Sequence, residues 1–201
     1  NSKQSTRLVS DYPTVNLIVK KEDFQKIGGF NNRYWPGEDT ILCLNIVKKL
    51  KKNIIYHPSI VVFHHRREAI KAHLQQITRY AIHRGHFAKI YPETSRKLGY
   101  FIPTVFTLYT IIFLILNLFK NNLLKNYSEI IFFYNLPLYI YLSILFTTFF
   151  KFIFDGQKLK TSTLAMITIP ITHFYYGILF LHGLFKKEIN FKAHAFDKKR
   201  K

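Results

Sequence analysis

The 201-residue chain has a single cysteine, Cys43, and only 11 acidic residues against 30 Lys and Arg. One cysteine excludes an intrachain disulfide and a cysteine-rich metal site. Cys43 falls in a helical pattern, where we expect it to be a small buried residue. The scarcity of acidic residues leaves a formal net charge of +19. Such an excess favours anionic partners, whether nucleic acid, acidic lipid or phosphorylated ligands.

Three segments lack Asp, Glu, Lys and Arg altogether: residues 98–119, 130–150 and 161–185. Each is long enough to cross a hydrocarbon core, which takes about 20 apolar residues as a helix. Lipid offers the backbone no hydrogen-bond partner, so we expect these segments to be helical. Buried helices of a soluble protein are the alternative interpretation.

Positive charge is in excess on both sides of the first apolar run. Residues 1–97 hold 18 Lys and Arg against 7 acidic residues, and the remainder holds 12 against 4. Because membrane segments are present, anionic lipids and phosphate-bearing ligands are the expected partners. The sequence has no recognisable nucleic-acid-binding motif, so no nucleic-acid partner is expected.

The chain lacks an initiator methionine and a visible signal peptide. It opens with Asn1, and its only methionine is Met166. The first apolar cluster, residues 15–19, is too short for a signal peptide. We therefore expect the chain to be the C-terminal piece of a longer protein.

Strand-like and helix-like patterns alternate between residues 14 and 91, after an irregular lead-in at 1–13, and predict an α/β layer. The predicted strands are residues 14–19, 54–56 and 60–63. The predicted helices are residues 21–27, from Asp39 to about 50, and from 68 to about 91. The last of these helices is basic and amphipathic, which predicts that it lies in the plane of the membrane interface.

The loop Trp35-Pro36-Gly37-Glu38-Asp39 places two carboxylates between a Pro-Gly turn and a helix start. Asp39 can cap the free amides of residues 40–42, which stabilises a helix by about 1 kcal/mol. It can also act as a general base at the mouth of a site. The two roles are compatible, because capping hydrogen bonds keep a carboxylate ionised and oriented.

Several motifs occur in order between residues 14 and about 90. They are Asn16-Leu17-Ile18-Val19-Lys20-Lys21, Phe24 with Gly28-Gly29-Phe30, the Trp35 to Asp39 loop with Leu42-Cys43-Leu44, His57-Pro58, Val61-Val62-Phe63-His64-His65-Arg66-Arg67, and Gln76-Ile77-Thr78-Arg79-Tyr80 before Arg84-Gly85. Together they resemble family-2 glycosyltransferases of the GT-A fold, and the apolar segments that follow resemble the membrane-bound, polysaccharide-assembling members.

The resemblance implies three parts. Residues 1–97 would be the C-terminal half of a GT-A nucleotide-diphospho-sugar transferase domain, ending in the basic interfacial helix. Residues 98–185 would hold two to three transmembrane helices, and residues 186–201 would be a basic tail. The fold class expected is thus α/β followed by an α-helical membrane region.

The resemblance also implies roles for individual residues. Asp39 matches the general base, with Glu38 as its companion. Gly28, Gly29 and Phe30 match an acceptor-side loop, where the missing Cβ atoms let a sugar approach the backbone. Trp35 would stack on a sugar face, or would only pack the turn.

Gln76, Arg79 and Tyr80 match a Gln-x-x-Arg-Trp element, with tyrosine in place of tryptophan; this departure leaves processivity open. Arg79 would stabilise the charge on the leaving nucleotide. The alternative is that Arg79 and Arg84 belong to a solvated or lipid-facing basic stripe. His64 matches a histidine of the divalent-metal site. The alternative is that His64 is not a ligand, because lone histidines are more often not ligands and at most one of the adjacent His64 and His65 would face a metal.

The family's Asp-x-Asp metal motif is absent from this sequence. In the family, such carboxylates hold Mg²⁺ or Mn²⁺ against the donor diphosphate. We therefore expect the metal to be bound mainly by a missing upstream half, and this piece alone to be inactive.

The function expected is inverting glycosyl transfer from a nucleotide-sugar to a lipid-linked or polysaccharide acceptor. It would take place at the cytoplasmic face of the cell membrane, in a multi-pass protein. The alternative is a non-catalytic, basic, membrane-anchored scaffold or assembly subunit. A transporter fragment is a third interpretation, for which the apolar segments contain few polar residues.

The orientation of the tail poses a conflict. If residues 1–97 are cytoplasmic, three full crossings would put the basic tail outside, against the tendency of Lys and Arg to stay inside. One remedy is that residues 98–119, with Pro103 near their start, lie partly along the interface. Two crossings would then return the tail to the cytoplasm.

Overall fold

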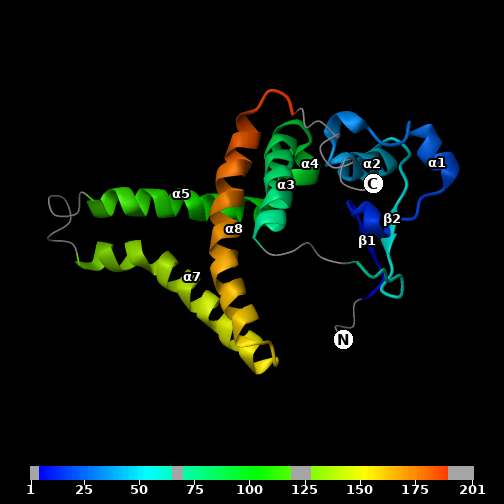
Figure 1. The fold of residues 1–201 in the computed structure, drawn as a ribbon. Helices are drawn as coiled ribbons and strands as arrows, with labels where there is room; N and C mark the ends of the chain where they lie inside the picture. Colours follow the sequence, from blue (N-terminus) through cyan, green and yellow to red (C-terminus); the bar gives the residue numbers. More distant parts are fainter. Residues whose placement is uncertain (1–4, 65–69, 119–127, 190–201) are drawn as a thin grey trace.

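The chain is mostly helical, with one small sheet and three long apolar helices in its C-terminal half (Figure 1). The structure is a computed structural model, and it describes residues 5–64, 70–118 and 128–189. The motif residues His65, Arg66 and Arg67, the end of the first apolar run and most of the basic tail lie outside the described residues.

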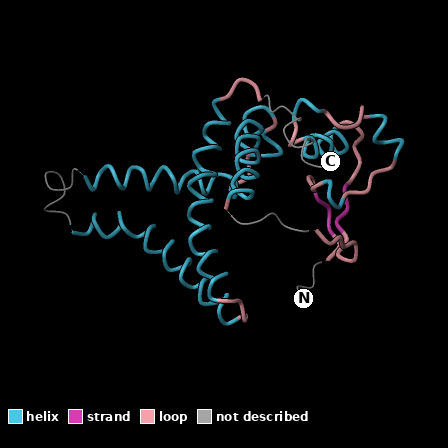
Figure 2. The backbone as a smooth tube through the Cα atoms, viewed as in Figure 1, coloured by secondary structure: helices cyan, strands magenta, loops and turns pink. Residues whose placement is uncertain are grey.

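The N-terminal part is small and contains the only strands among the described residues. Strand β1 (Arg7–Val9) pairs antiparallel with β2 (Ile54–Tyr56), and Leu8 lies opposite Ile55. Figure 2 shows how short this pair is beside the helices. The other elements of this part are listed by residue: η1 (Thr14–Asn16), α1 (Lys21–Lys26), η2 (Asn32–Tyr34) and α2 (Glu38–Lys48).

The α/β prediction is therefore confirmed only in part. The predicted strand at 54–56 and the helices near 21–27 and 39–50 are present. The strand expected at 14–19 is wrong: its first residues form the single turn η1, where Asn16 N donates to Pro13 O at 3.2 Å. Residues 60–63 form no strand either. β-branched residues fit a strand only where a neighbouring strand accepts their hydrogen bonds, and the described residues offer none here. No GT-A sheet is seen in the described part of the chain.

The α2 helix is anchored by a small apolar core. Leu42, Cys43 and Ile46 on α2 are buried together with Ile54 of β2. Cys43 is fully buried, as its place in the sequence predicted. This core fixes α2 against the sheet, so the position of Asp39 in its first turn follows from the packing of the rest of the helix.

The long helices begin with α3 (Lys71–Ile90), which is followed by the short α4 (Pro92–Ser95). Three apolar helices follow: α5 (Leu98–Leu118), α7 (Ser128–Phe154) and α8 (Leu159–Phe185). Each of the three is long and apolar enough to cross a membrane. Most of the large apolar side chains described on these helices are exposed, as expected of surfaces that face lipid.

The α3 helix packs lengthwise on the last half of α8. Three side-chain contacts advance together along both helices, so the two run parallel: His73 with Thr172 at 3.0 Å, Thr78 with Tyr175 at 2.9 Å, and His86 with the carbonyl of Lys186 at 3.2 Å. Two helices packed lengthwise have nearly the same tilt relative to a membrane. The α3 helix can therefore lie flat on a membrane only if this half of α8 lies flat too.

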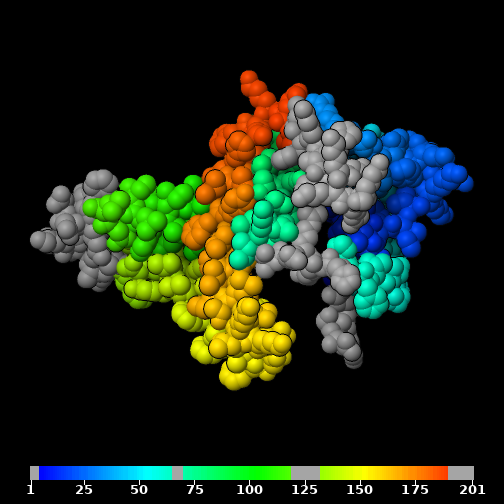
Figure 3. Space-filling view, viewed as in Figure 1, coloured from blue at the N-terminus to red at the C-terminus, as the bar shows by residue number. Residues whose placement is uncertain are grey.

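Glycines allow this close approach. A Cβ on Gly85 of α3 would collide with the backbone carbonyl of Phe180, and one on Gly183 of α8 would collide with that of Ile82. Close helix contacts through small residues are typical of membrane proteins. The α5–α7 pair lies on the other side of α8 from the N-terminal part (Figure 3).

Candidate functional site

A cavity of about 580 Å³ lies between the start of α2 and α3. Its wall is built from four stretches of the chain: residues 11–13, the loop and first turn at 35–37 and 39–40, one face of α3, and residues 97 and 100 around the start of α5. Five residues predicted from the sequence line it together: Trp35, Asp39, Gln76, Arg79 and Tyr80. Two motifs about forty residues apart in the sequence thus meet at one cavity.

Asp39 is half-buried in the wall of this cavity. The α2 helix begins one residue earlier, at Glu38, with Gly37 in the N-cap position, so Asp39 is not the capping residue. Within α2, its Oδ1 atom accepts a hydrogen bond from Thr40 N at 2.8 Å. Burial raises the pKa of the Asp39 carboxyl; the backbone bond to Thr40 opposes this, Asp11 adds to it, and Arg84 opposes it.

Trp35 and Arg79 face each other across the cavity wall. The Arg79 guanidinium lies over the Trp35 ring, 4.7 Å from its centroid. The loop that carries Trp35 is pressed onto α3, because a Cβ on the buried Gly37 would lie 3.0 Å from the His83 and Phe87 rings. Arg79 is therefore partly buried and forms a contact pair between the loop and α3.

His83 is buried beneath the cavity, and its Nδ1 atom pairs with Arg79 O at 2.8 Å. Burial lowers its pKa, although the hydrogen bond to Arg79 opposes this shift. The imidazole is therefore held neutral over a wider pH range than in a free chain.

Two charged residues at the cavity escaped the sequence interpretation. Arg84 Nη2 donates to Asp11 Oδ2 at 3.0 Å, and the two side chains are only 10% and 14% exposed. Asp11 lies in the stretch predicted to be an irregular lead-in, so no local pattern marked it. Arg84 stands beside Gly85 in the sequence, and the motif resemblance implies no catalytic or binding role for it. Lys97 also lines the cavity.

The remaining predicted residues lie elsewhere. Gly28 and Gly29 end α1 with φ of +78° and +69°, and Phe30 packs edge-on against Phe24 at 5.2 Å. Phe30 lines a separate hollow beside α1. None of the three lines the cavity of Asp39.

Glu38 and His64 also lie away from the cavity wall. In the described part of the chain, the Glu38 Oε2 atom is buried without a hydrogen-bond partner. Burial raises the pKa of the Glu38 carboxyl. His64 is the last residue before a stretch that the structure does not describe.

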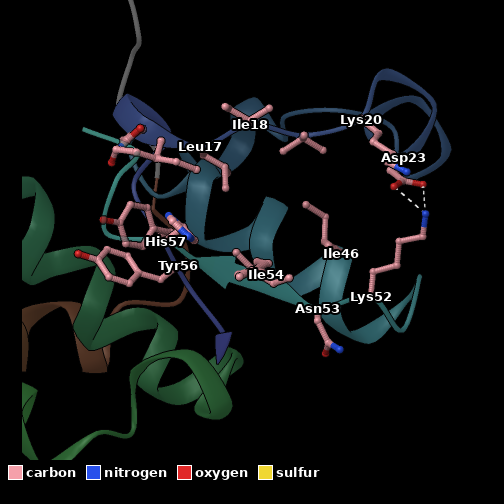
Figure 4. A pocket seen from close by; sticks show the side chains of 15 residues that line it. Leu17, Ile18, Lys20, Asp23, Ile46, Lys52, Asn53, Ile54, Tyr56 and His57 are labelled. Carbon is pink, nitrogen blue, oxygen red and sulfur yellow. Dashed lines mark hydrogen bonds and ion pairs between the residues drawn. The ribbon is translucent and has the colours of Figure 1, made fainter. Parts of the chain in front are cut away.

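A second cavity, of about 510 Å³, lies between residues 16–20 and the α2–β2 layer. Figure 4 shows aliphatic side chains in its middle, including Leu17, Ile46 and Ile54, and the Asp23–Lys52 pair at one end. Lys52 Nζ donates to both Asp23 oxygens, at 2.6 and 2.7 Å. None of the predicted site residues lines this second cavity.

The described residues contain no group of three or more His, Cys, Asp and Glu that could hold a metal ion. By themselves they therefore do not fit the divalent metal that the resemblance implies. Comparison of the chain with protein-family models, curated proteins and solved structures finds no significant match.

Proposed function

We propose that the protein transfers a sugar from a nucleotide-sugar to a lipid-linked or polysaccharide acceptor at a membrane surface, with inversion at the anomeric carbon. The observation that carries the proposal is the convergence of Trp35, Asp39, Gln76, Arg79 and Tyr80 on one cavity. The motif resemblance named these residues from two separate segments. Packing between the loop and α3 brings them together.

Asp39 is the proposed general base. It takes the proton from the acceptor hydroxyl as that oxygen attacks the anomeric carbon and the bond to the nucleotide diphosphate breaks. A positioned base contributes about 10²–10⁴-fold in rate. Burial raises the pKa of Asp39, and this makes the carboxylate a stronger base than a free aspartate.

The other cavity residues bind and orient. Arg79 is the proposed partner for negative charge on the leaving diphosphate, since a guanidinium presents several donors in a fixed plane. Trp35 and Tyr80 offer ring faces on which a sugar can stack. Gln76 supplies a polar amide at the same wall. We derive no step through a metal ion, because the described residues do not form a site for one.

The cavity adjoins the first apolar helix, and this position supports a membrane-bound acceptor. Lys97 and Tyr100, at the start of α5, line the cavity together with Asp39. An acceptor held in the membrane would therefore reach the base from the α5 side. The excess of Lys and Arg favours a membrane that contains anionic lipids.

The structure bears on the conflict over orientation. The end of α8 returns to the N-terminal part of the chain: Glu188 pairs with Arg33 at 3.3 Å, and Ile189 is buried. At the other end of the apolar region, Arg96 Nε donates to Ala88 O at 2.8 Å, which ties the start of α5 to α3. These contacts support the proposal that the chain enters and leaves the three apolar helices on the same side of the membrane.

A chain that returns to its starting side makes an even number of crossings. We therefore propose two crossings, α7 and α8, with residues 1–97 and the basic tail on the cytoplasmic side. In this arrangement α3 stands along the last half of α8 and does not lie in the plane of the interface, where its sequence pattern had predicted it. In Figure 1, α5 lies across α8, which supports its placement along the interface. This arrangement keeps the seven Lys and Arg of residues 186–201 in the cytoplasm. Near the α7–α8 turn, only Lys151, Lys158 and Lys160 would then lie on the outer side of the membrane.

Thiol labelling in intact cells tests this orientation. Cys43 is buried, and burial raises its pKa to about 11, so the native thiol should stay unlabelled. We expect Gln157→Cys to react with a membrane-impermeant maleimide from outside, and Lys187→Cys to react only after permeabilisation. Labelling of Lys187→Cys in intact cells would contradict the arrangement.

The experiment for the activity is transfer of radiolabelled sugar in membranes that contain the protein, expressed from its complete reading frame. A panel of nucleotide-sugars is offered, and label is counted in lipid-extractable and polymer fractions. We expect transfer with at least one donor, above membranes that lack the protein. A non-catalytic scaffold predicts no protein-dependent transfer from any donor.

A further inference from the structure

Asp11 and Arg84 form a largely buried ion pair, and both residues lie in the wall of the cavity that holds Asp39. The Arg84 guanidinium contacts several groups. Besides Asp11, its Nη1 atom donates to Thr94 O at 3.3 Å and to Ser95 Oγ at 3.4 Å. Its guanidinium also lies 5.1 Å from the Tyr80 ring centroid and 4.8 Å from that of Tyr100. A cation held by this many partners has one orientation.

Asp11 connects this fixed cation to the first turn of α2. Its Oδ2 atom accepts from Arg84 Nη2 and also from the Thr40 hydroxyl, at 3.2 Å. The backbone N–H of Thr40 in turn donates to Asp39 Oδ1 at 2.8 Å. Thr40 is only 4% exposed, so it has little freedom to move away from either carboxylate.

From this geometry we propose that Asp11 is a positioning residue of the site, which sets the place and the charge balance of the Asp39 carboxylate through Thr40 and Arg84. The inference rests on the proposed function, in which Asp39 is the base. Asp11 brings a like charge near Asp39, and Arg84 brings the opposite charge. The two charges therefore act on the Asp39 carboxyl in opposite directions.

Other ionisable groups also face this region and have to be held constant in any test. On α2 they are Glu38 and Cys43; on α3 they are Arg79, Tyr80 and His83; and at the start of α5 they are Lys97 and Tyr100. Cys43 and Tyr100 interact electrostatically with Asp11, and Tyr100 also interacts with Arg84. Burial raises the pKa of Cys43 to about 11, and a tyrosine ordinarily titrates near about pH 10, so both stay protonated where Asp39 titrates. The residues themselves are the same in both variants, so a comparison between the two variants reports on the pair.

The test is a titration of the Asp39 carboxyl by NMR. The chain has five aspartates, so labelling only aspartate with ¹³C gives a countable set of carboxyl signals, and Asp39→Asn identifies the one to follow. Asp11→Asn removes a like charge and leaves Arg84 unpaired, so the Asp39 midpoint should fall, by roughly one pH unit. Arg84→Gln removes the opposite charge, so the midpoint should rise.

Two controls make the result specific. Asp23→Asn breaks another ion pair, with Lys52, and should leave the Asp39 midpoint unchanged. The double variant Asp11→Asn/Arg84→Gln removes both charges and leaves no lone buried ion, so it should fold even if a single variant does not. Its midpoint should lie between those of the two single variants and near that of the wild type.

A purely structural role predicts another result. Loss of packing would move the midpoint in the same direction for both single variants, or would leave it unmoved, and either outcome overturns the proposal. If only one of the single variants folds, its Asp39 midpoint is compared with that of the double variant. A midpoint shifted in the direction predicted for that variant supports the proposal, and a shift in the other direction overturns it.

The activity readout is the acid limb of transfer against pH. It should move down in Asp11→Asn and up in Arg84→Gln, in parallel with the NMR midpoints. Absence of transfer in the wild type would sink the proposed function and leave the positioning of Asp39 to stand on the titration. If transfer occurs but the Asp39 midpoints of the two single variants equal that of the wild type, only the positioning role of Asp11 is contradicted.

Discussion

The guanidinium of Arg79 lies over the indole of Trp35, 4.7 Å from the ring centroid, and both residues line the cavity of Asp39. A cation over an aromatic face is stabilised by about 0.5–2 kcal/mol, depending on its exposure to water. The contact connects the loop before α2 to α3, so it holds the two motif segments at a fixed distance.

Arg79→Lys keeps the charge and loses the planar group, so we expect transfer to fall by roughly 3- to 30-fold, the equivalent of about 0.5–2 kcal/mol. Trp35→Leu should cost a similar factor, and the double variant should cost less than the product of the two. Arg7 lies over Tyr56 at 5.0 Å, away from the cavity, so Arg7→Lys is a matched control. Equal losses for Arg7→Lys and Arg79→Lys would remove Arg79 from the site.

The glycine contacts between α3 and α8 predict a stability effect. Gly183→Ala should destabilise the protein by about 1–3 kcal/mol, because the added methyl group forces apart two closely packed backbones. Gly99→Ala, on α5, meets no atom within 4 Å and should be neutral or slightly stabilising. Thermal unfolding in detergent checks both; equal midpoints for the two variants would argue against the α3–α8 packing.

His83 makes stability depend on pH. Burial lowers its pKa in the folded protein below the ordinary value of 6.5, so the unfolded chain binds the proton more readily. The stability that the neutral ring provides is present above pH 6.5 and is lost as the pH falls towards the folded pKa. We expect His83→Gln to show a smaller loss of unfolding temperature between pH 7.5 and pH 5 than the wild type. A wild-type loss equal to that of the variant would count against this assignment.

The sequence predicted those helices that are marked by a pattern of neighbouring residues. The charge-free runs became α5, α7 and α8, and the Pro-Gly turn before Asp39 preceded α2. The strand expected at 14–19 failed, since a strand depends on a partner that the pattern does not supply. β1 was missed because three residues in an irregular stretch carry no periodicity.

The candidate site was predictable where a motif named its residues, and not where it depends on distant contacts. Asp39 and Arg79 were named, and they line one cavity. Asp11 reaches Arg84 across 73 positions of sequence, a contact that no spacing rule indicates. The motif also named Gly28 and Gly29, but their turn follows α1 and does not line the cavity of Asp39.

The most direct measurement of the central claim is the transfer rate of Asp39→Asn, in membranes that hold equal amounts of inserted protein. Asp155→Asn, in the exposed turn between α7 and α8, is the matched control. The account predicts a fall of about 10²–10⁴-fold for Asp39→Asn and no change for Asp155→Asn. A rate for Asp39→Asn equal to that of the wild type would contradict the claim that this carboxylate takes the proton from the acceptor.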